Sequence, residues 1–188
     1  MISHSAKMAL NQWFSKALKE SMVAASGDQC AIETEDGNAA FPETKVVMLT
    51  SSSYVYRIFT VIYFDADLKT REHFARRTRA DAQDMTDQEF IDAVCESANM
   101  TCGSLNRDLG RVYPHIGLST PNILEARSAD HLNVLQSGHL QHFRVDINGA
   151  TLFHASMCVC EFADMDFSVG ALAAVAEEEV DSGELEMF

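Results

Sequence analysis

The dipeptide Asn148-Gly149 is the feature that most narrows how this chain can fold. Asparagine and glycine both tolerate positive φ, so the pair is typical of the two-residue turn of a β-hairpin. Residues 140–147 before it alternate between polar and apolar, and three of the apolar side chains share one face: Phe143, Val145 and Ile147. Residues 150–161 follow as the return strand. The second half of the chain is therefore predicted to contain a long antiparallel hairpin with one buried face.

Two long helices are predicted, over residues 5–25 and 86–112, because apolar residues recur there at helical spacing. Gly27 is well placed to end the first of them. The second opens with a capping box, in which Thr86 supplies a hydroxyl and Glu89 a carboxylate three residues later. The start of the second helix is therefore well defined by sequence alone.

A shorter helix is expected over residues 68–79, and it carries the basic cluster of the chain: Arg71, Arg76, Arg77 and Arg79. This cluster is either a solvated helix face or a docking surface. Strands are expected in runs of β-branched and aromatic residues between turn signals. These runs are residues 29–34, 45–50, 54–64 and 115–119. The second and third runs lie so close together that they predict another hairpin, whereas residues 121–138 fit either a strand or a short helix.

The order of these elements divides the chain into two similar halves, each with a long helix, a strand and a hairpin. This order predicts an α+β fold, in which two helix-plus-three-strand halves form a mostly antiparallel sheet covered by long helices. No glycine-rich phosphate loop or serine-elbow motif occurs, and a doubly wound fold does not suit the order. We expect one domain over residues 1–165, followed by an acidic tail over residues 166–188.

The charge of the chain limits its partners. Its 188 residues carry a formal net charge of −14, and the chain remains acidic without the Asp- and Glu-rich residues at its end. Such acidity argues against nucleic acid, because binding to phosphates depends on Lys and Arg. The chain has neither an apolar run long enough to span a bilayer nor the apolar region of a signal peptide. A cytoplasmic protein that does not bind membranes is the expectation.

Five cysteines, an odd number, fit reduced thiols better than a disulfide framework. Cys158 and Cys160 share one face of a predicted strand, which suits two small buried residues. Neither a Cys-x-x-Cys nor a His-Glu-x-x-His spacing occurs among the cysteines and seven histidines. No metal site is expected, and a metal-dependent hydrolase ranks last among the functions that we consider.

Residues 92–103 carry the pattern that points most directly to a function. Residues three and four apart lie on one face of a helix, so four positions form one stripe: Asp92, Glu96, Asn99 and Gly103. The apolar residues of the same helix lie largely on other faces. A carboxylate and a carboxamide one turn apart, with a glycine one turn further on, make a surface that a partner can approach closely.

This stripe resembles the active-site helix of the CheC/CheX/FliY family of chemotaxis phosphatases. The family pattern is Asp or Ser, three residues, Glu, two residues, Asn, and a proline further along the chain, which is Pro121 here. The chain looks most like the CheX branch. The first helix has Ser15, Lys19 and Met22 where CheC-type members carry a second Glu/Asn pair, so one active site is expected.

The resemblance implies an enzyme that removes phosphate from the aspartyl-phosphate of a CheY-type receiver domain. Asn99 would enter the receiver site and orient the attacking water, whereas Glu96 would anchor to the receiver lysine. Asp92 and Gly103 would contact the partner. The protein would need no cofactor of its own, because the phosphorylated receiver supplies Mg²⁺. A homodimer is also implied.

Two other functions remain open. A CheX-like domain can serve as a non-catalytic docking module for a receiver domain or a flagellar motor component. A structural role through the edges of the sheet is compatible with either activity.

Overall fold

The computed structural model describes residues 1–35, 41–78 and 81–170, and within them seven strands form one sheet. The strand order is β1-β6-β7-β3-β2, and both β4 and β5 pair with β2 at the other edge. Every pair of neighbouring strands is antiparallel. The strands are β1 (Cys30–Glu35), β2 (Lys45–Ser52), β3 (Tyr56–Phe64), β4 (Gly117–Leu118), β5 (Asn122–Glu125), β6 (His139–Ile147) and β7 (Ala150–Glu161).

The sheet exchanges strands between the two halves of the chain. The hairpins β2–β3 and β6–β7 meet at the centre, where β3 pairs with β7. The first strand of each half crosses to the hairpin of the other half: β1 pairs with β6, and β4 and β5 pair with β2. The predicted α+β fold with two helix-and-strand halves is confirmed, and the halves are interlocked rather than separate.

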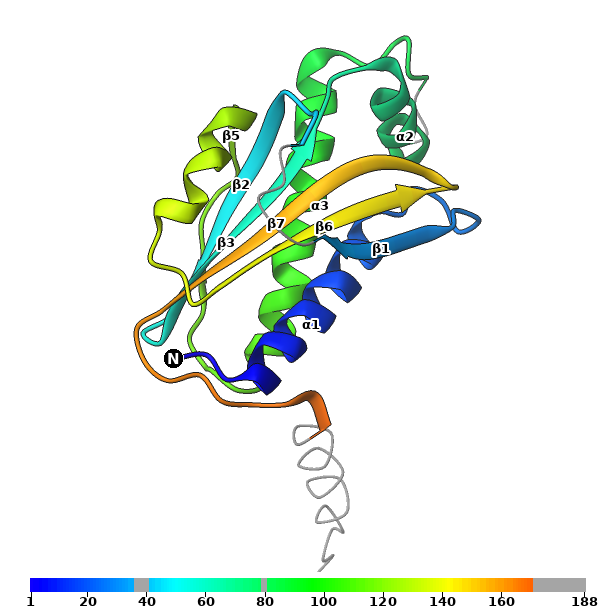
Figure 1. The fold of residues 1–188 in the computed structure, drawn as a ribbon. Coiled ribbons are helices and arrows are strands. Elements are labelled where there is room, and N and C mark those ends of the chain that lie inside the picture. The colour runs from blue at the N-terminus through cyan, green and yellow to red at the C-terminus, as the bar shows by residue number, and fades with distance from the viewer. Residues whose placement is uncertain (36–40, 79–80, 171–188) are drawn as a thin grey trace, which may run out of the picture.

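Two long helices, α1 (His4–Met22) and α3 (Asp87–Leu109), cover one face of this sheet, as the strands passing in front of α3 show in Figure 1. A shorter helix, α2 (Leu68–Thr78), packs beside α3. The three apolar residues expected on one face of β6 are buried in the main core below these helices: Phe143, Val145 and Ile147. No helix among the described residues is long and apolar enough to cross a membrane.

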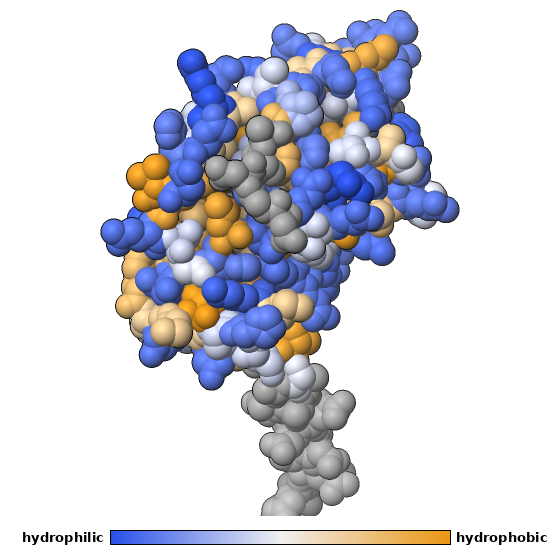
Figure 2. Space-filling model, viewed as in Figure 1, coloured by the Kyte–Doolittle hydropathy of each residue, from blue (hydrophilic) through white to orange (hydrophobic). Residues whose placement is uncertain are grey.

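The opposite face of the sheet, which we call the outer face, carries a smaller core. The 3₁₀ helix η1 (Ala126–Val134) packs Ala129 and Leu132 onto Val46, Val61 and Cys158. From this side most of the visible surface is hydrophilic, and hydrophobic residues gather in separate small patches (Figure 2). The outer face is therefore a partly covered polar surface rather than a second broad apolar layer.

The predicted turns form as their residue types require. Asn148 and Gly149 have φ of 54° and 78°, as a tight hairpin turn needs. Thr86 caps α3, and its side chain accepts from the Glu89 backbone while the Glu89 carboxylate accepts from the Thr86 backbone. Both sequence signals are confirmed.

Some element boundaries differ from expectation for local reasons. Helix α1 ends at Met22 rather than near residue 25, because the Asp28 carboxylate accepts hydrogen bonds from the N–H groups of Ala24 and Ala25 and turns the chain. Gly27 therefore does not cap this helix. Strand β3 starts at Tyr56, because the Ser53 hydroxyl accepts hydrogen bonds from the backbone N–H groups of Val55 and Tyr56 and holds the chain in a turn up to that point.

Residues 121–138, left open by sequence, contain both a strand and a helix. Pro121 lies between the short strands β4 and β5, at the edge of the sheet where a residue without an N–H is tolerated. At the C-terminal end, Phe167 stacks on Trp13 of α1 with ring centroids 5.2 Å apart. Packing thus continues past residue 165, and most of the expected acidic tail, residues 171–188, lies outside the described residues, as do residues 36–40 and 79–80.

Replacing Thr86 by alanine should lower the free energy of unfolding by about 1 kcal/mol, because the cap hydroxyl is lost. Thr86→Ser keeps the hydroxyl and should stay close to wild type. Urea unfolding of the three proteins measures the difference. Equal losses in both variants would mean that the methyl group of Thr86, and not the cap, carries the stability.

Candidate active-site helix

Helix α3 has one apolar face that fixes how it lies on the sheet. Six of its residues are at most 2% exposed and pack into the main core: Phe90, Val94, Ala98, Cys102, Leu105 and Leu109. Burying large apolar side chains is the dominant favourable contribution to folding. The rotation of α3 about its own axis is therefore set by this face, and the opposite face must point outward.

The predicted stripe lies on that outward face. Asp92, Glu96 and Gly103 are exposed, and Asn99 is half-buried. The Asp92 carboxylate accepts a hydrogen bond of 2.7 Å from Gln88. Among the described residues, no hydrogen bond or ion pair involves the side chains of Glu96 or Asn99. Both groups are therefore available to a partner.

A seam of small polar residues joins α3 to α1, and sequence reasoning missed it. The hydroxyls of Thr101 and Ser21 lie 2.6 Å apart, and Ser104 donates to Glu20 over 2.8 Å. A third contact continues the seam, because the buried carboxylate of Asp108 pairs with Lys16 at 3.0 Å. Each polar group in the seam has a partner, which is the usual condition for burial. The signal in the sequence was the spacing of Thr101, Ser104 and Asp108 on one side of the helix.

The basic cluster on α2 holds the helices together. Arg77 donates to the backbone oxygen of Ser21 and to the Ser97 hydroxyl, each at 2.6 Å. Arg71 pairs with Asp87 and lies over the Phe90 ring at 4.9 Å. Neither a simple solvated face nor a free docking surface describes Arg71 and Arg77. Arg76 is exposed and pairs with Asp28 at 3.1 Å, and Arg79 lies outside the described residues.

A hollow of about 200 Å³ lies between α1 and α3, directly beside the stripe. Gly103 lines it together with Met100 and Arg107 of α3, and Glu20 of α1 contributes to the opposite wall. The stripe is thus bordered by a shallow depression rather than a deep substrate pocket.

Two thiols of α3 lie beside the stripe in sequence, Cys95 and Cys102, and burial raises the pKa of both, that of Cys102 to about 11. Burial, and then the charge of Asp92, raise the pKa of Cys95. A thiol with a raised pKa stays protonated near neutral pH and reacts poorly. Among the described residues, no group of three or more His, Cys, Asp or Glu side chains could hold a metal ion.

On α1, the positions that sequence reasoning compared with a second site are separated. Ser15 is half-buried, Lys19 is exposed and Met22 is 1% exposed. These three residues therefore do not form an exposed polar stripe like that on α3.

Comparison with known proteins places the fold. The family model described as chemotaxis phosphatase CheX matches residues 57–148, which include all of α3. A crystal structure of the chemotaxis protein CheX from Desulfovibrio desulfuricans has a TM-score of 0.59 at 15% identity, over 80% of this chain and 99% of that one. The chain resembles the CheX family in sequence and in fold.

Two further structures agree with this CheX-like fold. The CheX–CheY–BeF₃–Mg²⁺ complex from Borrelia burgdorferi gives a TM-score of 0.57 at 10% identity, covering 81% of this chain and 96% of that one. A CheC-like superfamily protein from Shewanella sp. PV-4 gives 0.56 at 13% identity, over 81% and 97%. No curated protein sequence matches the chain. The resemblance expected from the stripe is confirmed for the family and for the fold.

Replacing Gly103 by alanine should raise the free energy of unfolding by about 0.5–1 kcal/mol, because glycine is unfavourable inside a helix. A Cβ built at this position meets nothing within 4 Å, so the isolated CheX-like domain gives no steric reason for a glycine. Urea unfolding of wild type and variant measures the change. A lower stability of the variant would show that the fold itself needs Gly103.

Proposed function

We propose that this protein is a CheX-like phosphatase that removes phosphate from the aspartyl-phosphate of a CheY-type receiver domain. The observation that carries the proposal is the stripe, in which the side chains of Glu96 and Asn99 lie one turn apart and have no partner among the described residues, on a helix packed against the sheet. The Borrelia structure contains CheX together with CheY and Mg²⁺, which supports a receiver as the partner of a protein with this fold. Action as a homodimer remains a prediction.

Asn99 has the chemistry to orient a water molecule. A carboxamide can accept a hydrogen bond from water through its oxygen and donate one to a phosphoryl oxygen through its nitrogen. It brings no negative charge next to the phosphoryl group. In phosphoryl transfer, positioning and electrostatic stabilisation supply most of the catalysis. A half-buried carboxamide on α3 would therefore suffice as the contribution of this chain to the reaction.

Glu96 is better suited to anchoring than to chemistry. Its carboxylate would repel a phosphoryl group at close range, but it would attract a lysine at the rim of a receiver site. Because Glu96 lies almost one turn before Asn99, an ion pair there would fix the position of Asn99 along the helix axis. Mg²⁺ in this scheme belongs to the receiver, and no ligand from the CheX-like chain is needed.

Gly103 and Asp92 lie beyond the central pair at either end. The open space around Gly103 would let the backbone of a partner approach α3 more closely than any side chain allows. Asp92, held by Gln88, would present a second carboxylate to basic groups of the partner. The stripe is then a convex surface that enters a concave receiver site, so a deep pocket in this chain is not required.

Asn99→Ala should slow phosphate release from a phosphorylated receiver by about 10²-fold or more, by comparison with the loss of one hydrogen-bond donor at an oxyanion site. The measurement is multiple-turnover phosphate release from a Mg²⁺-loaded receiver with substoichiometric protein. Gln136→Ala, which removes an exposed carboxamide from the loop after η1, is the matched control and should leave the rate unchanged.

Two results of this experiment would reject the catalytic role. Full activity in Asn99→Ala would remove Asn99 from the mechanism. Tight receiver binding by wild type without turnover, unaffected by Asn99→Ala, would instead favour the non-catalytic docking module.

Gly103→Ala should weaken binding of the receiver by about tenfold, because a methyl group inserted into a close contact costs about 1–3 kcal/mol. Receiver affinity is measured by titration with a phosphoryl analogue bound to the receiver. The free energy of unfolding of the same variant is the control, and it should not fall. Unchanged affinity would show that the partner does not approach α3 at Gly103.

A further inference from the structure

The outer face of the sheet holds a pocket that the proposed phosphatase does not use. Its volume is about 390 Å³, within the range of small-molecule sites, and it lies between η1 and the sheet. Six residues that matter for binding line it: Phe41, Glu43, Tyr63, Arg127, Asp130 and His142. We call this space the outer-face pocket. The stripe on α3 belongs to a helix that covers the other face of the sheet.

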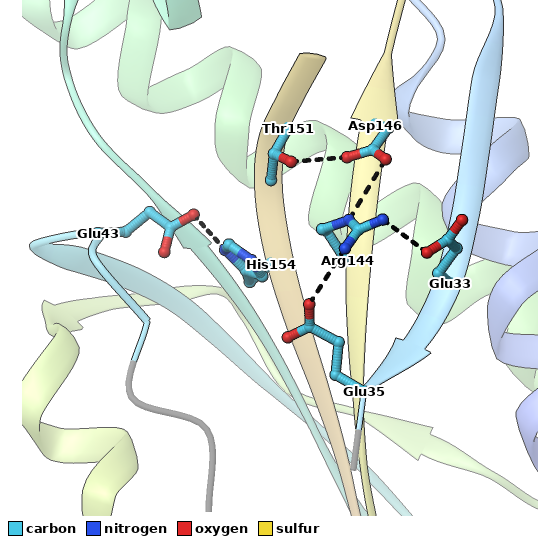
Figure 3. A network of polar contacts seen from close by, with 7 residues as sticks. All are labelled: Glu33, Glu35, Glu43, Arg144, Asp146, Thr151 and His154. Atoms are coloured by element: carbon cyan, nitrogen blue, oxygen red, sulfur yellow. Dashed lines mark hydrogen bonds and ion pairs between the residues drawn. The ribbon is translucent and has the colours of Figure 1, made fainter. Parts of the chain in front are cut away.

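The buried carboxylate of Glu43 lines this pocket, and one of its oxygens is unpaired among the described residues. The Glu43 side chain is 7% exposed, and its Oε1 lies 2.6 Å from Nδ1 of His154. Its Oε2 is buried and has no hydrogen-bond partner among the described residues. Figure 3 shows this second oxygen directed away from His154. A buried acceptor left unpaired is costly, so a donor is expected to meet it.

Two nearby cations, Arg144 on β6 and Lys69 on α2, do not supply that donor. Arg144, opposite His154 in the strand register, is held by three carboxylates, with Asp146 at 3.3 Å and Glu33 at 2.5 Å (Figure 3). Lys69 donates to the backbone oxygen of Thr151 over 3.0 Å. No described side chain donates to Oε2 of Glu43, so this oxygen is open to a donor from solvent or from a ligand.

A second acceptor follows from the hydrogen-bond chain beside Glu43. Ser156 donates to the Tyr63 hydroxyl over 3.2 Å, and Nδ1 of His142 lies 2.7 Å from the Ser156 oxygen. Since Ser156 has only one proton to donate, Nδ1 of His142 donates to it, and Nε2 is left to accept. Burial lowers the pKa of His142, which keeps the ring neutral near pH 7.

Carboxylates and aromatic rings dominate the remaining surroundings. Burial is the main cause that raises the pKa of Tyr63, and the charges of Asp130 and Glu43 add to it, so both carboxylates lie near its hydroxyl. The Phe41 ring stacks on the His154 ring with centroids 4.4 Å apart, and it meets the Tyr63 ring edge-on with centroids 4.7 Å apart. Aromatic faces and carboxylates both favour a cation. Arg127 is the one lining residue that opposes this charge preference.

We propose that the outer-face pocket binds a small free organic ammonium ion, a primary amine on a short apolar or aromatic body. Its N–H groups donate to Oε2 of Glu43 and Nε2 of His142, and its body packs against Phe41. The amine thereby supplies a donor to Oε2 of Glu43, which has none among the described residues.

The test is a titration of the full chain with three probes of one shape: benzylammonium, benzyl alcohol and benzoate. Binding is followed by saturation-transfer NMR and by ¹⁵N spectra of the histidine rings. Benzylammonium should bind and shift the His142 Nε2 resonance, and the other two probes should bind at least about tenfold more weakly, because a hydrogen bond with an ionised partner is roughly twice as strong as a neutral one. Equal binding of all three, or none at millimolar benzylammonium, would overturn the proposal.

Variants locate the site and identify the source of the amine. Glu43→Gln keeps the shape of the side chain and should weaken benzylammonium binding about tenfold or more. Arg127→Gln, on η1, should leave binding unchanged or tighten it. An effect of Arg127→Gln alone would overturn the charge assignment. Should Glu43→Gln not fold, the ring ¹⁵N shifts of the wild-type chain still decide. Tighter binding of a lysine tripeptide than of any free amine would reassign the pocket to a protein partner.

Discussion

The burial of one face of α3 against the sheet is the constraint on which the rest of the structure depends. Six apolar residues between Phe90 and Leu109 fill the main core, and a one-residue rotation of the helix would expose them. Hydrophobic burial alone therefore selects which polar residues face outward. The stripe from Asp92 to Gly103 needs no local strain to be presented, because its exposure is a consequence of the packing on the other side of the same helix.

The polar seam between α1 and α3 adds precision to this arrangement. Apolar contacts tolerate small sliding movements, whereas the 2.6 Å contact between Thr101 and Ser21 holds only in one register. Asp108, nearly buried, is paired with Lys16 and lies 3.7 Å from Arg111. Removing Lys16 would leave the buried carboxylate of Asp108 with a weaker partner, Arg111. The seam therefore opposes sliding of α3, which the proposed role of Asn99 in orienting water requires.

Sequence alone predicted the parts of this fold that local chemistry determines. The Asn148-Gly149 turn, the Thr86 capping box and the alternation in β6 each act within a few residues, so their signals are readable. The secondary structure of residues 121–138 could not be predicted from sequence. Strand β5 is stabilised by pairing with β2, and η1 is stabilised by packing on the outer face. The contacts of Arg71 and Arg77 on α2 were not predicted for the same reason, because their partners lie on α1 and α3. The outer-face pocket is lined by residues of β3, β6 and η1 and by Phe41 and Glu43 before β2, and no spacing in the sequence joins them.

The proposed chemistry explains why so little of the chain has to carry it. In a reaction where the partner supplies the phosphorylated group, the metal ion and a lysine, this chain has to present only a carboxamide and an anchor. Those two groups fit on less than two turns of one helix. Most other positions then have to satisfy only the requirements of the fold. This is compatible with the finding that proteins of the same architecture share only 10–15% sequence identity with this chain. A surface helix packed against the sheet suits the proposed reaction better than a pocket does, because the reacting group would lie inside the partner.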